Sequence, residues 1–401
     1  MNNSWKIYLL TLISFLVGTS QFVIAGILDD VATSAGVSLL AAGQLITAFS
    51  LATAIGTPVV MVATAKMGQR MQLLLALTII LLGTILTIAL PGFGFLLLSR
   101  IVLGVGSGVF VVTAYATAAN LAPVGRQAGA MSNVAMGYSA SLVLGVPIGR
   151  VVAAAYDWKV IFWGIGLFTL LGIFAVAKAI PSIRGEASVP LGKQLALLKN
   201  PKISTALCVT FFVFIGYSVV NTYMAPFLTS VMSFNGGVVS VILFVLGIAS
   251  LIGSKLGGFL ADRTGTARTL VISLIIQALP LGLLSIAFGS NLVAIPLLVL
   301  WTIATWTFGP TQNFNLLSLA PEASGIMLSL NSTFVQLGFA VGAGIGGVAV
   351  GGSSIFSIFW IGAAAVVMAS VSFGLTRKFS KRATTEQVYY RSRIIKFTYK
   401  K

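Results

Sequence analysis

The sequence contains no histidine, a single cysteine and only 7 acidic residues among 401. Without histidine, the commonest general base and the usual partner of a catalytic serine are missing. A metal site of the Cys/His type cannot form either. Cys208 has no partner for a disulfide bond within the chain. We therefore expect no enzyme, no bound metal and no cofactor.

Charged residues of both signs are scarce as well. They make up 8% of the chain, whereas hydrophobic residues make up 58%. A soluble domain carries roughly a quarter of its residues as charged ones. Apolar runs of about 20 residues, long enough to cross a bilayer as a helix, recur from end to end. Because backbone polar groups must be satisfied internally in lipid, we predict an all-α polytopic membrane protein.

The apolar runs predict twelve membrane spans in two sets of six. They lie at 6–28, 38–63, 71–90, 94–118, 128–154, 159–180, 203–228, 235–260, 269–288, 291–316, 325–348 and 353–375. The spans define two six-helix bundles at 1–180 and 203–375. A polar linker at 181–202 joins them, and a basic tail follows at 376–401.

Positive charge collects on one side of the predicted spans. With an even number of spans, both termini share a side with the linker. Of the 24 lysines and arginines, all but Arg100, Arg150 and Lys159 fall on that side. The positive-inside rule places it in the cytoplasm. The net charge of +17 is therefore a topology signal that also favours contact with anionic lipid, and it does not indicate nucleic-acid binding.

The sequence also contains an internal repeat. The loop 65–70 after the second span matches 262–268 after the eighth span, aligned on Gly68 and Gly265. The same offset of 197 residues carries Gly145 onto Gly342 and Gly149 onto Gly346. Repeated halves, with substrate bound between them near the midplane, are typical of secondary transporters.

Several motifs carry a resemblance to a known family. They are Gly-Gly-Phe-Leu-Ala-Asp-Arg-Thr-Gly at 257–265, Arg100 to Gly106 in span four, Gly137 with Gly145 to Gly149 in span five, and 18–30 in span one. With these motifs the whole chain resembles the major facilitator superfamily. Within it, the chain is similar to the twelve-span drug/proton antiporters, including bacterial sugar and purine-nucleoside efflux permeases. The resemblance implies a bacterial plasma-membrane exporter driven by proton exchange. Two positions depart from the family pattern: Ala65 replaces an aspartate and Gln21 replaces a glutamate.

The candidate gating residues lie in span five and at the end of span eight. They are Gly137, Gly145, Pro147, Gly149, Gly258, Asp262, Arg263 and Gly265. A carboxylate at Asp262 can latch onto the positive N-terminus of a neighbouring helix, or it can be a solvated loop charge. Small residues allow close helix packing in lipid, so we expect the span-five glycines to seal against span eight, with general packing as the alternative. Pro147 can bend the helix.

The candidate proton-coupling residues are Asp30, with Asp29 as the alternate, and Arg100. A charge within a span indicates a functional site by default. Arg100 lies about six residues, or roughly 9 Å, below the outer surface. Span one ends on that side at the two aspartates. A carboxyl beside an arginine has a lowered pKa and burial raises it, so movement between states can change proton affinity. The alternative is that both aspartates are solvated.

The candidate substrate-binding residues are the polar side chains Gln21, Asn221, Tyr223, Asn331 and Gln336. No carboxylate lies at mid-span, which favours neutral or weakly polar small molecules such as a drug, sugar or nucleoside. We therefore expect a monomeric exporter that works by alternating access, in exchange for protons. An uncoupled facilitator, favoured by Gln21, is one alternative. A non-transporting receptor or lipid-handling scaffold is the other.

Overall fold

The computed structural model describes residues 4–90, 92–123, 127–182, 191–286, 291–320, 324–352 and 354–398. The described residues form helices and no strand, and twelve of these helices or helix combinations are long and apolar enough to cross a membrane. The all-α fold with twelve spans is therefore confirmed. The first half contains α1 (Ser4–Gly26), α2 (Leu28–Ala35), α3 (Leu39–Ala63), α4 (Gln69–Ala89), α5 (Phe93–Leu121), α6 (Gln127–Ala140), η1 (Ser141–Gly145), α7 (Val146–Ala155) and α8 (Lys159–Ala179).

The second half begins after the short helix α9 (Leu191–Leu197). It contains α10 (Pro201–Thr222), α11 (Met224–Pro226), η2 (Phe227–Val231), α12 (Gly236–Thr264), α13 (Thr266–Ile286), α14 (Asn291–Leu319), α15 (Ser324–Gly352) and α16 (Ser357–Thr398). Residues 183–190 of the predicted linker lie outside the described residues. The predicted span boundaries agree with these helices to within a few residues, except at the end of α16.

Polar side chains cap the helices where the chain re-enters the bundle. Ser38 accepts a hydrogen bond from the Ala41 backbone N–H at 3.2 Å at the start of α3. Asn235 does the same for Val238 at 2.9 Å at the start of α12. Such caps satisfy backbone donors that the first helical turn leaves free. Gly36 ends α2 in the left-handed conformation at φ 63°, which favours glycine.

Span five contains a π-helical turn next to Pro147. The π-helical turn η1 separates α6 from α7 directly before this proline. A proline inside a helix donates no N–H and crowds the preceding turn. The wider π turn relieves that crowding. The Val146 N–H accordingly reaches back five residues to the Ser141 carbonyl.

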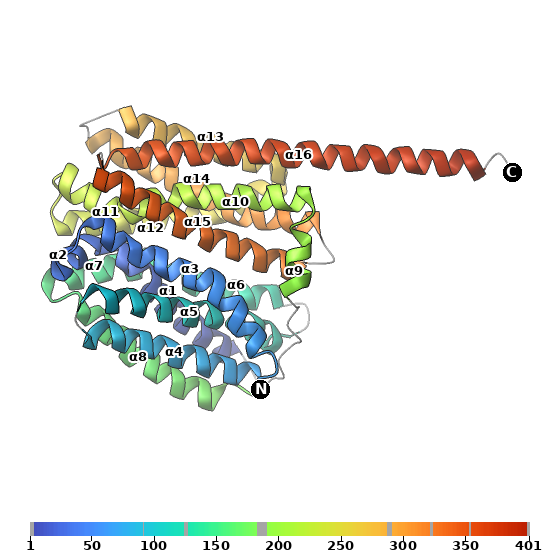
Figure 1. Cartoon of the computed structure of the whole chain (residues 1–401). Coiled ribbons are helices and arrows are strands. Elements are labelled where there is room, and N and C mark those ends of the chain that lie inside the picture. The colour runs from blue at the N-terminus through green and yellow to red at the C-terminus, as the bar shows by residue number, and fades with distance from the viewer. Residues whose placement is uncertain are drawn as a thin grey trace.

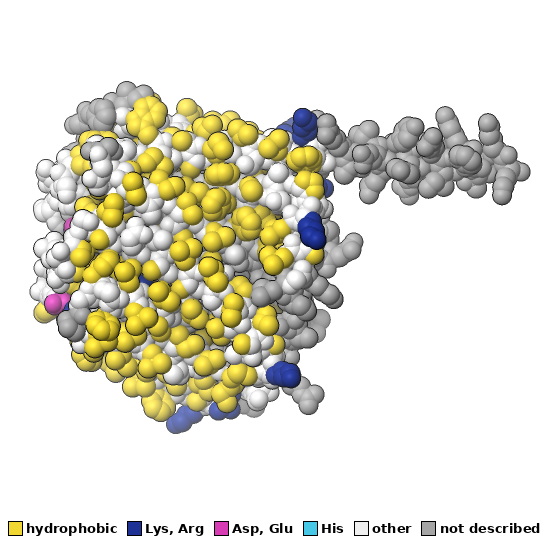
Figure 2. Space-filling view, in the orientation of Figure 1, with side chains coloured by type: hydrophobic (Ala, Val, Ile, Leu, Met, Phe, Trp, Pro, Cys, Tyr) yellow, Lys and Arg dark blue, Asp and Glu magenta, His cyan; other side chains and the backbone are white. Residues whose placement is uncertain are grey.

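The two halves lie side by side, with the spans running roughly parallel (Figure 1). The short helices α2 and α11 lie at one end of the bundle, which we call the α2 end. The N-terminus and α9 lie at the opposite end, which we call the α9 end. Figure 2 shows a surface rich in hydrophobic side chains between the two, with lysines and arginines near the α9 end and acidic residues at the α2 end.

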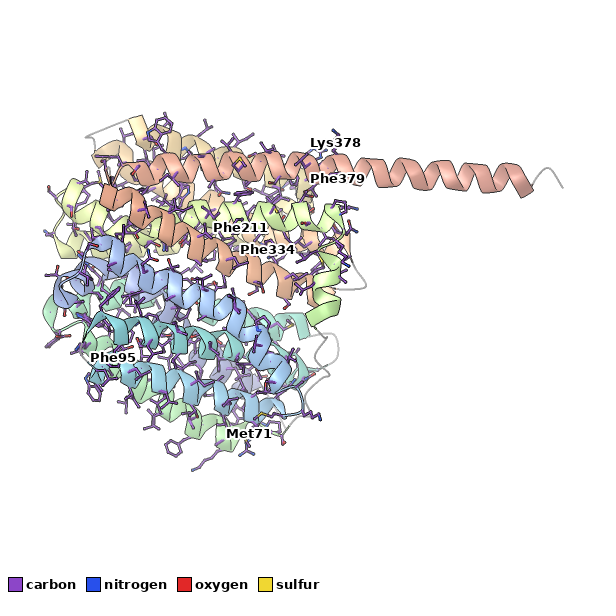
Figure 3. All side chains as sticks on the ribbon, viewed as in Figure 1. Met71, Phe95, Phe211, Phe334, Lys378 and Phe379 are labelled. Atoms are coloured by element: carbon purple, nitrogen blue, oxygen red, sulfur yellow. The ribbon has the colours of Figure 1, made fainter. Side chains whose placement is uncertain are left out.

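The sides of the bundle carry exposed apolar residues, as a lipid-facing surface requires. Phe95 and Met71, labelled in Figure 3, are 45% and 55% exposed on the first half. The helix α16 leaves the bundle near Lys378 and Phe379 and continues to Thr398 (Figure 3). The predicted tail therefore continues the last span as a helix, and its sequence contains no proline or glycine that would stop it.

Candidate functional site

The glycines of span five pack against span one, and this corrects the prediction that they face span eight. A Cβ at Gly145 would lie 2.4 Å from Thr19 Oγ1, and a Cβ at Gly149 would lie 2.2 Å from Val23 Cγ2. A Cβ at Gly137 would lie 2.1 Å from the Thr11 carbonyl oxygen. The period of these glycines defines one helix face, but sequence spacing does not say which neighbour covers it.

Span eight approaches span five through a glycine of its own. A Cβ at Gly247 would lie 2.5 Å from Val143 Cα and 3.1 Å from the Leu142 carbonyl oxygen. Val143 and Leu142 both lie within the π turn η1. The sequence did not single out Gly247, because it is one of several glycines in this span.

The two aspartates at the end of span one form an ion pair with Arg150, which corrects the prediction that they face Arg100. Arg150 Nη2 lies 2.9 Å from Asp29 Oδ2, and Nη1 also contacts Asp29 Oδ1. The same Nη1 lies 3.1 Å from Asp30 Oδ2 and 3.1 Å from the Gly26 carbonyl oxygen. Arg150 is only 5% exposed. A buried guanidinium held in this way by two carboxylates is fully charge-compensated.

The environment of Asp30 favours its protonated form. Burial and the neighbouring charge of Asp29 raise the pKa of Asp30 above its ordinary 3.8, against the opposing effect of Arg150. The charged groups packed around it are Asp29 on α2 itself and Arg150 on α7. A raised carboxyl pKa means that this closed packing favours the protonated form.

Arg100 lies deeper in the first half, apart from both aspartates. It is 1% exposed, its Nη1 donates to the Ser20 carbonyl oxygen at 3.1 Å, and its guanidinium carbon lies 4.8 Å from the centre of the Phe162 ring. Its Nε and Nη2 have no hydrogen-bond partner among the described residues. Ser20 precedes Gly26 by six residues, which is about 9 Å along a helix. That difference in depth separates Arg100 from the acidic pair.

Gln21 lies at the junction between the two halves. Its side-chain oxygen accepts a hydrogen bond from the Tyr138 hydroxyl of α6. The next residue, Phe22, packs edge-on against Tyr138 at 5.5 Å and reaches Phe339 of the second half at 6.4 Å. The predicted site residue Gln21 therefore belongs to a neutral polar pair beside an aromatic contact between the halves.

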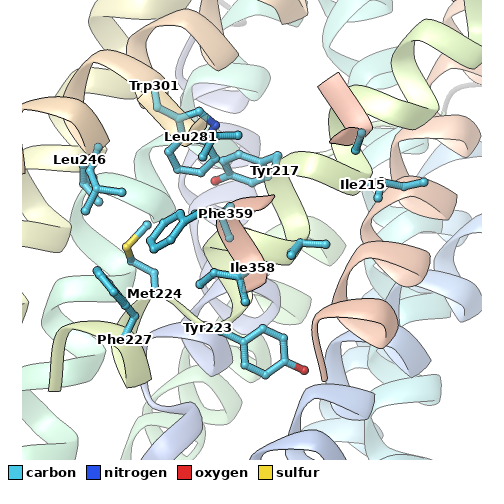
Figure 4. Packing of buried hydrophobic residues seen from close by; sticks show 14 of the residues in the cluster. Ile215, Tyr217, Tyr223, Met224, Phe227, Leu246, Leu281, Trp301, Ile358 and Phe359 are labelled. Atoms are coloured by element: carbon cyan, nitrogen blue, oxygen red, sulfur yellow. The ribbon is translucent and has the colours of Figure 1, made fainter. Parts of the chain in front are cut away.

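A small cavity of about 40 Å³ lies between the halves beside Phe22. Aromatic residues Phe22, Tyr217, Trp301 and Trp306 line it together with Asn221, Ser250 and Thr302, while Gly26, Ala25 and aliphatic residues complete the wall. The prediction had placed Asn221 in a binding pocket, and the structure puts it here. The stacked pair Tyr217 and Trp301 is visible in Figure 4. The pair was missed because aromatic residues in apolar spans give no periodic signal.

Tyr223 does not line the cavity, and Figure 4 shows its ring apart from Tyr217 and Trp301. Its hydroxyl donates to the Ala343 carbonyl oxygen at 3.0 Å. Glycines make room for it: a Cβ at Gly43 of the first half would lie 1.9 Å from this hydroxyl oxygen, and one at Gly347 would lie 2.7 Å away. Thr47 of the first half adds a hydrogen bond to the Ala340 carbonyl oxygen at 3.1 Å. The halves are therefore in close contact at this end.

Asn331 and Gln336 both lie on α15 and are buried. Asn331 accepts a hydrogen bond from Thr210 at 2.7 Å and donates to Asn313 at 2.8 Å. Gln312 extends the network by donating to Thr210 at 3.1 Å. The network links α10, α14 and α15 toward the α9 end, so the structure places Asn331 apart from the aromatic cavity.

The loop after span eight contains the remaining predicted gating residues. Gly265 caps α12 at φ 88°, in the left-handed region, and its N–H donates to the Ala261 carbonyl oxygen at 3.1 Å. Arg263 lies 5.9 Å from the centre of the Phe259 ring. Gly258 has open space where a side chain would project. The side chain of Asp262 lies outside the described residues.

The fold and the contact surface between two six-helix halves define a multi-pass membrane transporter, and comparison with known proteins agrees. The chain belongs to the Major Facilitator Superfamily, whose model matches residues 10–342 and 206–392. It is 45% identical over 372 residues to the MFS-type transporter YbcL of Bacillus subtilis (strain 168), covering 93% of this chain and 95% of the relative. The chain is thus a transporter and not an enzyme.

Solved structures share this fold at low sequence identity. A D-xylose–proton symporter superposes with a TM-score of 0.76 at 17% identity, covering 93% of this chain and 97% of the other. The nucleoside transporter NupG gives 0.75 at 12% identity, covering 94% and 100%. An inward-facing, unoccupied bacterial homologue of the human lysosomal transporter Spinster gives 0.74 at 16%, covering 95% and 98%. These likenesses establish the architecture.

Proposed function

We propose that this transporter exports small neutral or weakly polar organic molecules in exchange for protons. The observation that carries the proposal is the ion cluster of Asp29, Asp30 and Arg150 at the α2 end. The cluster joins α2 to span five, the same span that packs on span one and approaches span eight. Opening the α2 end would hydrate Asp30 and return its pKa toward the ordinary value. Proton affinity then differs between the two states, as coupling requires.

The proposed orientation places the α9 end in the cytoplasm of a bacterial plasma membrane. It is supported by the lysines and arginines collected there, which also favour contact with anionic lipid. In this orientation the close contact between the halves at the α2 end faces outward. We propose that the halves 1–180 and 203–375 move as rigid bodies in a monomer. The loop after span eight, with Asp262 and Arg263, would act as the inner latch.

The orientation predicts which cysteines an impermeant reagent reaches. In a Cys208→Ala background, Ser34→Cys lies exposed on α2 and Lys199→Cys lies exposed after α9. We expect a membrane-impermeant maleimide to label Ser34→Cys in intact cells and to label Lys199→Cys only after the cells are opened. The reverse pattern would overturn the proposed orientation.

Asp30→Asn should remove proton coupling while leaving the transport pathway intact. Export from proteoliposomes is measured with and without an imposed pH gradient, over a range of pH. For the unmodified protein, we expect the gradient to drive accumulation and the pH profile to titrate above 3.8 because the Asp30 pKa is raised. Lower pH favours the closed α2 end, since protonation relieves the repulsion between the two carboxylates. Asp30→Asn should lose driven accumulation and keep passive exchange.

Asp157→Asn is the matched control for Asp30→Asn. Asp157 also lies at the α2 end, where its Oδ1 accepts a hydrogen bond from the Lys159 N–H at 2.7 Å. An asparagine oxygen can accept the same bond, so we expect normal coupling. Asp29→Asn and the double variant Asp29→Asn with Asp30→Asn are measured in the same way. Accumulation driven by a pH gradient in the double variant would rule out this cluster as the coupling site.

An uncoupled facilitator is the second candidate function. It is favoured by Gln21, which stands where the efflux branch that the chain resembles has a glutamate, and which forms a neutral hydrogen-bonded pair with Tyr138. The same proteoliposomes separate the two functions. A facilitator would equilibrate substrate at a rate indifferent to the imposed pH gradient, already in the unmodified protein.

A further inference from the structure

The aromatic cavity between the halves has a composition that restricts what it can bind. None of the described residues that line it carries a charge. An unpaired charge is costly to bury away from water, so both cations and anions would be disfavoured. Ligand sites of this kind are mostly apolar, with a few polar groups that fix orientation.

The rings form a corner in which a flat molecule can stack. Tyr217 is stacked on Trp301, with ring centres 5.7 Å apart and planes inclined by 20°. Trp306 stands perpendicular to Tyr217 at 6.0 Å and 90°. Phe22 approaches from the other half, so the walls belong to both halves. Offset stacking and edge-to-face contact are the two geometries that aromatic rings prefer.

The polar groups of the cavity define the edge of the ligand. Ser250 donates its hydroxyl proton to the Gly247 carbonyl oxygen at 2.6 Å, and Thr302 donates to Leu298 at 2.8 Å. With their protons used, these hydroxyl oxygens can only accept further hydrogen bonds. The amide of Asn221 can both donate and accept. A ligand edge with a neutral donor and a neutral acceptor side by side matches this set.

We propose that the cavity, widened as the halves separate, binds a planar, uncharged aromatic molecule with an amide-like edge. The molecule stacks in the corner of Tyr217, Trp301 and Trp306 and directs its polar edge toward Asn221, Ser250 and Thr302. The inference rests on the proposed function in one respect, namely that the transported substrate passes between the halves. The cavity has a volume of about 40 Å³ in this structure and holds little more than water, so binding requires the halves to move apart.

Matched probes test this inference by equilibrium binding to the purified full chain. Benzamide and cyclohexanecarboxamide share an amide edge and similar size, and only benzamide has an aromatic face. Benzoate and benzamidine keep the ring but carry a negative and a positive charge. We expect benzamide to bind about 3- to 10-fold more tightly than cyclohexanecarboxamide, the range that aromatic contacts add beyond burial. The two charged probes should bind more weakly than benzamide.

Variants then locate the binding. Trp306→Leu and Trp301→Phe should weaken benzamide binding and reduce its advantage over cyclohexanecarboxamide, with the larger loss for leucine. Trp301→Phe keeps an aromatic ring in this buried position, so we expect the variant to fold and its binding can be measured. Trp360→Leu is the control, because Trp360 is 54% exposed on α16 and does not line the cavity. We expect Trp360→Leu to bind both probes normally.

Equal affinity for benzamide and cyclohexanecarboxamide would overturn the proposal, as would tighter binding of either charged probe. An equal loss in Trp360→Leu would do the same. Because binding is measured without a gradient, these outcomes leave the proton-exchange proposal untouched. Conversely, preferential binding of benzamide together with pH-independent flux would overturn only the coupling.

Discussion

Gly43→Leu should prevent the α2 end from closing and reduce transport about 5- to 150-fold. A Cβ at this position would already lie 1.9 Å from the Tyr223 hydroxyl oxygen and 2.9 Å from its ring carbon Cζ. The ring cannot retreat easily, because it is buried and a Cβ at Gly346 would lie 2.7 Å from its Cε2. Overpacking of this kind costs about 1–3 kcal/mol, and that cost corresponds to about a 5- to 150-fold change in a two-state equilibrium.

The expected opening can be measured directly. Spin labels at Ser34→Cys on α2 and Ser230→Cys on η2, in a Cys208→Ala background, report the separation of the halves at the α2 end. We expect Gly43→Leu to lengthen the distance distribution. Adding Tyr223→Ala removes the clashing ring and should restore the short distances and most of the transport. Unchanged distances in Gly43→Leu would show that Tyr223 does not close this end.

Gly145→Leu is expected to abolish transport by separating span five from span one. Its Cβ would lie 2.4 Å from Thr19 Oγ1 and 3.1 Å from Thr19 Cβ, so the branched side chain has no space. The contact between spans one and five holds Arg150 beside the aspartates. Separating the two spans should therefore also remove the pH response. We expect both the thermal unfolding temperature and the rate of substrate export to fall.

The compensating change identifies which neighbour matters. Gly145→Ala combined with Thr19→Gly places the glycine on span one in place of span five. The double variant should recover export relative to Gly145→Ala alone. Gly164→Leu is the control in the same half, since nothing lies within 4 Å of a Cβ there. Recovery by a change in span eight, and not by Thr19→Gly, would contradict the observed packing on span one. Normal export by Gly145→Leu would contradict it as well.

The spans themselves were predictable, because length and hydropathy are local properties. The offset of 197 residues also held in three dimensions: Gly145 faces Thr19 of span one, and its equivalent Gly342 faces Ile215 and Ser218 of span seven. Sequence therefore indicated correctly which positions need small residues.

The partners of Asp29 and of the span-five glycines were not predictable in the same way. Sequence sets the depth of a residue along its span but not the rotation of the helix about its axis. Arg100 and Arg150 both lie in the α2-end half of their spans, but Arg150 contacts the aspartates while Arg100 contacts the Ser20 carbonyl oxygen deeper in the bundle. The aromatic corner depends on side chains from two different spans, α10 and α14, so no local pattern could reveal it.

The two halves place their bulky residue on opposite partners of one repeated contact, that of span one with span five and of span seven with span eleven. At the offset of 197, Gly26 corresponds to Tyr223 and Arg150 corresponds to Gly347. In the first half the bulky residue comes from span five and reaches the Gly26 carbonyl oxygen at 3.1 Å. In the second half it comes from span seven, and Gly347 leaves room for its hydroxyl. One half thus places a cation at this junction and the other an uncharged phenol. The two halves are therefore not interchangeable at this junction, although their sequences repeat.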